Sequence, residues 1–115
     1  MILHIDVVNK VATYQKRDGC IVCGNSGYQI EFNFDNEWNG VAKQAVVIVN
    51  GTPTHADIVP HEELDKEEGE VIVKYRCDVP IIRNADKVVV GVHSESAGMT
   101  TTGTEIPCKK SILCR

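Results

Sequence analysis

Apolar and polar residues alternate with a period of two along most of this chain. The clearest segment spans residues 28–35, where one face consists of Tyr28, Ile30, Phe32 and Phe34. Successive side chains of an extended chain point to opposite faces, so this pattern predicts a half-buried β-strand. The same alternation predicts strands at residues 2–8 and 71–79. On the second of these, the predicted inward face consists of Val71, Val73, Tyr75, Cys77 and Val79.

Two further runs, residues 45–49 and 88–92, are apolar on both faces and rich in valine, which is typical of central strands. Turn signals separate the strands, and Asn50-Gly51 predicts a hairpin tip. No window predicts an amphipathic helix, and the charge-rich stretch 62–70 is expected to be a solvated loop. Many short strands at close spacing predict an all-β fold, a single-domain antiparallel β-sandwich over residues 1–115.

Composition narrows the classes of partner. The 115 residues carry a net charge of −4, and the basic residues are scattered, which argues against nucleic acid. No apolar run reaches membrane-spanning length, so membrane insertion is not expected. The first residues lack the basic and apolar regions of a signal peptide, so synthesis in a cytoplasm is expected. Five cysteines are an odd number for a disulfide framework, and free thiols are the default in a reducing compartment.

Few side chains are spaced for catalysis or metal binding. Cys20 and Cys23, with Cys108 and Cys114, could offer four thiolates to zinc. A separation of three residues along a strand turns the first two to opposite faces, which favours structural cysteines. His4 with Asp6, and His55 with Asp57, could pair as metal ligands or as acid and base, although a polar outer strand face requires the same pattern. No motif activates a serine. The sequence therefore predicts no catalytic, cofactor or metal site and no enzyme.

Trp38 is the only tryptophan and follows the best strand directly. An exposed tryptophan at a strand end could stack on a sugar. A buried one would close the end of a β core, and its position after an apolar strand favours this interpretation. The exposure of its ring distinguishes the two hypotheses.

The segment from Gly27 to Gly40, which reads GYQIEFNFDNEWNG, followed by KQAVV at residues 43–47, resembles a known family. It is similar to small tail proteins and tail-fibre N-terminal modules of phages and prophages of Gram-positive bacteria, related in role to baseplate upper proteins. Val47 stands where the family often has phenylalanine. Later pieces agree in order along the chain: Cys77-Asp78-Val79-Pro80, residues 88–93, Thr100-Thr101-Thr102, and Ser111-Ile112-Leu113.

The resemblance implies a β-sandwich in the virion tail, at the baseplate or at the root of a fibre. The expected function is a non-enzymatic docking module that binds other tail or baseplate proteins. The alternative is a carbohydrate-binding module that uses Trp38 on a host-surface saccharide. The resemblance implies no catalytic residues, and it makes Tyr28, Ile30, Phe32, Phe34, Trp38 and Gly40 a signature of the fold and core.

A homo-oligomer is also expected, because open sandwiches leave strand edges that invite partners. Two segments are the predicted open edges, residues 2–8 and residues 100–106. The first has no proline or lysine to discourage pairing, and the second is polar, rich in threonine and short of charge.

Overall fold

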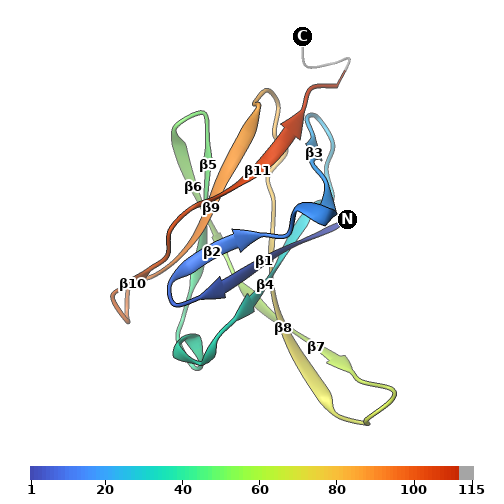
Figure 1. Ribbon diagram of the computed structural model, residues 1–115, viewed down its shortest axis with the longest axis vertical. Coiled ribbons are helices and arrows are strands. Elements are labelled where there is room, and N and C mark those ends of the chain that lie inside the picture. Colours follow the sequence, from blue (N-terminus) through green and yellow to red (C-terminus); the bar gives the residue numbers. More distant parts are fainter. Residues whose placement is uncertain (112–115) are drawn as a thin grey trace.

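The computed structural model describes residues 1–111, which form short strands joined by tight turns (Figure 1). The strands are β1 (Ile2–Val8), β2 (Val11–Tyr14), β3 (Ile21–Val22), β4 (Gln29–Phe34), β5 (Gln44–Val49), β6 (Thr52–Asp57), β7 (Val59–Leu64), β8 (Val71–Asp78), β9 (Lys87–Ser94), β10 (Met99–Thr100) and β11 (Thr104–Lys109). Two three-residue 3₁₀ turns, η1 (Lys16–Asp18) and η2 (Asn36–Trp38), are the only helical segments in this part of the chain. The predicted all-β class is confirmed.

The strands form two sheets that pack against each other, as a β-sandwich requires. The first sheet has the order β2-β1-β4-β8-β7, and the second has the order β3-β11-β9-β5-β6, with β10 also paired to β9. Most neighbours are antiparallel, but β1 pairs with β4 and β3 pairs with β11 in parallel, so both sheets are mixed. The two runs that are apolar on both faces become β5 and β9, which lie inside the second sheet as predicted.

The core lies between the sheets and is built from the inward side chains of the alternating strands. The first sheet contributes Leu3, Ile5, Val7, Ile30 and Phe32, and the second contributes Ala45, Val47, Val88, Val90, Val92 and Ile106, all at most 2% exposed. Valine and isoleucine dominate because branched side chains pack well on a pleated surface.

The predicted hairpin at Asn50-Gly51 joins β5 to β6. Both residues have positive φ, 50° and 80°, and the flanking Val49 and Thr52 are paired, which defines a type I′ turn. A second turn of this kind joins β1 to β2 through Asn9 and Lys10, with φ of 51° and 61°. The sequence carries no glycine there, and its pattern did not predict that turn.

The first segment that the sequence predicted as an open edge lies inside a sheet, because strand β1 is flanked by β2 and β4. In the second segment, residues 104–106 of β11 pair with β9 on one side only, because β3 pairs only with Cys108 and Lys109. The threonine-rich segment also closes the edge of β2. The Thr102 hydroxyl accepts a hydrogen bond from the Ala12 N–H (3.2 Å), and the Thr104 hydroxyl accepts one from the Tyr14 N–H (3.0 Å). The edge prediction was therefore wrong for residues 2–8, which lie between two strands, whereas residues 100–106 contact β2 through threonine hydroxyls and not through backbone pairing.

The charge-rich stretch 62–70 is not simply a loop. Strand β7 continues to Leu64, and only residues 65–70 turn before β8 begins. The β7–β8 hairpin extends away from the rest of the molecule, at the lower right of Figure 1. It contributes to an elongated shape of 47 × 35 × 20 Å.

Candidate interaction surface

Two of the signature residues, Phe34 and Trp38, form an aromatic–lysine cluster with Lys43 and Tyr75. The Trp38 ring is 0% exposed and lies 5.5 Å from the ring of Phe34, which in turn meets Tyr75 edge-on at 5.7 Å. The Lys43 ammonium lies 4.9 Å and 4.5 Å from the ring centres of Phe34 and Tyr75. It also donates hydrogen bonds to the carbonyl oxygens of Trp38 (2.7 Å) and Val41 (3.1 Å).

This cluster closes one end of the core. Because η2 places Trp38 directly after β4, its ring packs on the last aromatic residue of that strand. The Lys43 ammonium satisfies two carbonyl groups of the turn and gains cation–π contacts, while burial lowers its pKa. As the sequence predicted, the Trp38 ring is core. It offers no exposed face on which a sugar could stack.

The remaining signature residues lie in the core or in the turns beside β4. Ile30 and Phe32 are buried on the inward face of β4. The Tyr28 side chain is half-buried, and its hydroxyl accepts a hydrogen bond from the Val22 N–H (3.0 Å). Gly40 ends the turn after η2 with φ of 67°. These contacts fix the loop geometry around β4.

The outer face of the first sheet carries a network of charged side chains. Glu31 on β4 is only 4% exposed, and its carboxylate accepts a hydrogen bond from Arg76 Nε (3.1 Å). Arg76 also donates to Glu63 (2.9 Å), so it joins β4, β8 and β7. His4 on β1 extends the network, with Nδ1 3.0 Å from Asp18 and Nε2 3.4 Å from Glu31. The network thus ties four strands and η1 together on the face away from the core.

The two histidine–aspartate pairs do not form sites for a metal. His4 is engaged with Asp18 and Glu31, whereas the Asp6 carboxylate accepts hydrogen bonds from Gln15 and Asn33. His55 and Asp57 are both exposed on β6. Within residues 1–111, no group of three or more His, Cys, Asp or Glu side chains could hold a metal ion.

The described cysteines, Cys20, Cys23, Cys77 and Cys108, are all free thiols. Cys23 is buried while Cys20 is partly exposed. Cys114 lies outside the described residues. Burial raises the pKa of Cys77 from 9.0 to about 12, with a smaller contribution from the Asp78 carboxylate. Burial also raises the pKa of Cys108 to about 11, and the neighbouring thiols Cys23 and Cys20 add to this shift, followed by Asp86. A thiol with a raised pKa stays protonated at neutral pH and is a poor nucleophile.

The projecting β7–β8 hairpin is where the structure departs most from the predicted burial. Strand β8 pairs with β4 only as far as Tyr75, which faces Phe32, so its first half pairs with β7 alone. The register places Val71 opposite Leu64 and Val73 opposite Glu62. Paired residues share a face, and alternate residues along β8 do too. Tyr75, which contacts Phe34, marks this face as a continuation of the core face.

No second sheet covers the core-side face at the far end of this hairpin. Val71 is 62% exposed, Val73 is 44% exposed and Leu64 is 65% exposed. Farther along the chain, Cys77 on β8 and Val79 just after this strand are buried, as predicted. The prediction of one buried face along residues 71–79 was therefore wrong for Val71 and Val73. The alternation is present, but the strand continues beyond the sandwich. We refer to Leu64, Val71 and Val73 as the hairpin apolar face.

No protein-family model matches this sequence, and neither a curated protein nor a solved structure is detectably similar to it. The resemblance to phage tail and baseplate modules therefore stays a prediction that rests on the quoted residues. In the part of the chain that the structure describes, no helix is long and apolar enough to cross a membrane.

Proposed function

We propose that this chain is a non-enzymatic docking module of a phage or prophage tail or baseplate. It acts by protein–protein assembly, and the β7–β8 hairpin is its docking element. The resemblance around residues 27–47 supports the tail or baseplate setting, which would place the working protein in the virion after synthesis in a bacterial cytoplasm.

The observation that carries the proposal is the exposure of Val71 and Val73 on a strand that is patterned for burial. Full burial of one such side chain contributes about 1.5–3 kcal/mol, so leaving several in water forgoes a large share of a domain's stability. An isolated two-stranded hairpin is also marginally stable at best. Both disadvantages disappear if a partner covers the hairpin apolar face, which then completes the core face begun by β4 and β8.

The hairpin also presents backbone groups that a partner can use. Strand β7 is the edge of the first sheet, and residues 71–74 of β8 have no strand on the side away from β7. Such edges are templates for strand addition. Pro60 removes one N–H donor from β7 and limits uncontrolled pairing along it. A carbohydrate-binding function has no comparable support, because the ring of Trp38 is buried.

The test compares two double variants that carry the same chemical change. Val71→Thr with Val73→Thr alters the hairpin apolar face and keeps β-branched residues in the strand. Val8→Thr with Val11→Thr is the control, because these valines are 54% and 48% exposed on β1 and β2. Each chain is tagged and co-expressed with the products of its neighbouring genes, and the partners that co-purify are identified by mass spectrometry.

We expect the hairpin variant to weaken capture of a tail protein by more than about tenfold, because burying each new hydroxyl without a partner costs ~1–3 kcal/mol. The control should bind like the native chain. Both melting temperatures should stay near the native value, because substitutions of exposed residues usually change stability by less than ~0.5 kcal/mol. Undiminished capture by the hairpin variant would overturn the proposal, as would co-purification of no tail protein with the native chain.

A further inference from the structure

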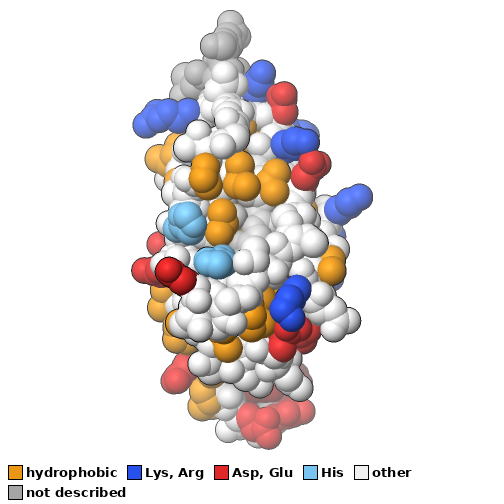
Figure 2. All heavy atoms as spheres, turned by 90° about the vertical axis from the view of Figure 1, so that its left-hand side faces the viewer, with side chains coloured by type: hydrophobic (Ala, Val, Ile, Leu, Met, Phe, Trp, Pro, Cys, Tyr) orange, Lys and Arg blue, Asp and Glu red, His pale blue; other side chains and the backbone are white. Residues whose placement is uncertain are grey.

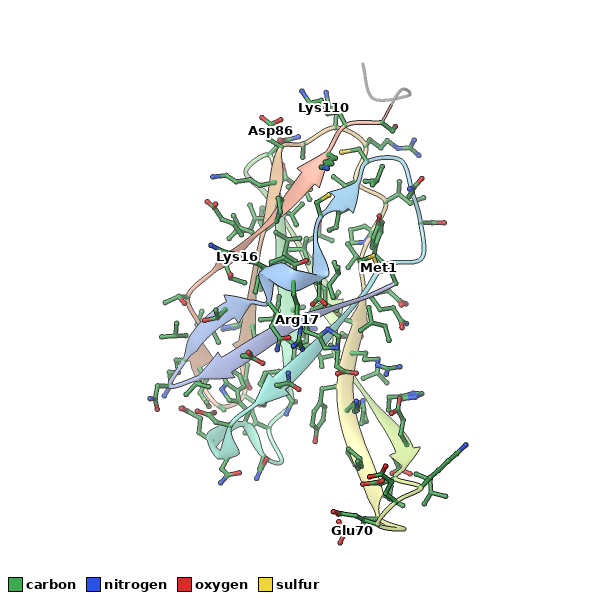
Figure 3. All side chains as sticks on the ribbon, turned by 45° about the vertical axis from the view of Figure 1, so that its right-hand side comes forward. Met1, Lys16, Arg17, Glu70, Asp86 and Lys110 are labelled. Carbon is green, nitrogen blue, oxygen red and sulfur yellow. The ribbon has the colours of Figure 1, made fainter. Side chains whose placement is uncertain are left out.

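The charges of this chain are segregated along its length. Residues 62–70 contain six carboxylates and one lysine, a formal charge of −5 in a chain whose total is −4. The rest of the molecule is therefore slightly positive. In Figure 2 a large group of acidic side chains lies at the lower end of the molecule, while others lie along its length. Figure 3 places Glu70 at that end, and Asp86 and Lys110 at the opposite end of the long axis.

The opposite end combines positive charge with exposed apolar surface. Basic residues there outnumber acidic ones by four to two; they are Arg83, Lys87, Lys109 and Lys110, against Asp86, which lies 3.8 Å from Lys110, and Glu105, which lies 2.7 Å from Lys87. Beside them is an open hollow of about 450 Å³ lined by Val49, Asn50, Thr54, Pro80, Ile81, Ile82, Arg83 and Asn84. Ile81 in this lining is 46% exposed. The hollow thus combines apolar side chains with polar ones and with the charged Arg83.

We propose that the β7–β8 hairpin of one copy docks on the basic end of a second copy, so that copies associate head to tail. This inference rests on the proposed function of the hairpin and adds another molecule of the same chain to the partners that the hairpin binds. The hairpin apolar face would contact the hollow around Ile81, while the carboxylates of residues 65–70 would face Lys109 and Lys110.

Charge decides between this arrangement and a symmetric pair of hairpins. A two-fold contact between hairpin tips would place residues 65–70, with four carboxylates and one lysine, against the same residues of the second copy, and like charges opposed across an interface are strongly unfavourable. The head-to-tail contact instead opposes charges of different sign. Such a contact uses two different patches, so it closes into a ring or continues as a chain of copies.

The contact is expected to be weak and sensitive to salt. Strand β7 is six residues long, so the contact strip along the hairpin spans only ~20 Å. The area buried along such a strip is at the low end for specific interfaces. Sedimentation equilibrium of the native full chain should therefore show association that grows with concentration at about 0.05 M salt. Raising the salt to ~0.5 M should weaken this association at least tenfold, because the interactions between exposed charges are then screened beyond a few ångströms.

Charge reversal tests the orientation of the contact. Glu67→Lys with Glu68→Lys, and separately Lys109→Glu with Lys110→Glu, should each reduce association at least tenfold at low salt. All four changes in one chain should restore it. A control variant, Arg17→Glu, reverses one exposed charge on η1 near the middle of the long axis (Figure 3), and should leave association intact.

A zero-length carbodiimide cross-link provides direct evidence of proximity. In a mixture of ¹⁴N- and ¹⁵N-labelled chains, we expect mixed-isotope links between residues 67–68 and residues 109–110. A native chain that stays monomeric at low salt overturns the inference, and so does a fourfold variant that fails to regain association. If such a monomer still loses its tail partner through the change at Val71 and Val73, this inference fails while the proposed docking function stands.

Discussion

Replacing Trp38 by alanine tests whether the aromatic–lysine cluster closes the core. The side chain is fully buried and packs against Phe34. Truncation of a buried tryptophan costs ~3–5 kcal/mol, because the transfer free energy is lost and a cavity remains. A domain of this size has ~5–15 kcal/mol in total, so the variant should keep the fold with much of its margin removed.

Trp38→Phe is the matched control. It keeps an aromatic ring against Phe34 and removes the indole N–H, which is buried without a hydrogen-bond partner. Loss of that unsatisfied donor offsets part of the lost volume. We therefore expect Trp38→Phe to cost about 1–2 kcal/mol, well below the alanine variant.

Urea unfolding followed by far-UV circular dichroism is the appropriate assay, because both variants remove the only tryptophan and its fluorescence. With a slope of ~2 kcal/mol per molar urea, a loss of ~4 kcal/mol lowers the midpoint by about 2 M. A loss within ~0.5 kcal/mol for alanine would show that the ring is not part of the core. An equal loss of unfolding free energy in the phenylalanine and alanine variants would also refute the packing argument, because it would assign the effect to the indole N–H.

Three further outcomes follow from particular contacts. Because burial raises the pKa of Cys77 from 9.0 to about 12, the folded state holds this proton more tightly. The contribution of this thiol to stability is complete below pH 9 and is lost as the pH rises through the pKa of the folded state, by at most ~1.4 kcal/mol per pH unit. Urea unfolding between pH 8 and 10.5 should therefore show a shallower decline of the unfolding free energy for Cys77→Ala than for the native chain. Arg76→Met should cost ~3–5 kcal/mol by leaving Glu31 buried without its arginine, and Glu31→Gln in the same chain should recover part of that loss in a double-mutant cycle. Incubation with a strong chelator should leave the melting temperature unchanged, because no group of three or more His, Cys, Asp or Glu side chains within residues 1–111 could hold a metal ion. A large drop together with stoichiometric zinc by elemental analysis would contradict this prediction.

Local patterns predicted the elements where a few neighbouring residues decide the outcome. Alternation identified β4, double-faced apolar runs identified β5 and β9, and Asn50-Gly51 identified a type I′ turn. The same logic missed the turn at Asn9-Lys10, because neither residue there is glycine and the register of β1 with β2 imposes the positive φ.

The sequence could predict the burial of Trp38 at the end of β4, but it could not predict the exposure of Val71 and Val73 at the start of β8. Trp38 follows an alternating strand directly, so its packing on Phe34 depends on a separation of four residues. The exposure of Val71 and Val73 depends on where the opposite sheet ends, which no local pattern reports. Likewise, the placement of Tyr75 and Lys43 around Phe34 joins three separate strands or loops.

The sequence by itself determined that this chain forms a β-sandwich with a buried tryptophan, because strand periodicity and turn chemistry act over a few residues. Only the tertiary structure decided which edges are open. Strand β1 is covered by parallel pairing with β4, and the edge of β2 is closed by threonine hydroxyls about 90 residues away in sequence. Contacts over such separations depend on how the whole chain folds. The same overall arrangement leaves the β7–β8 hairpin projecting, with the hairpin apolar face uncovered and an acidic tip.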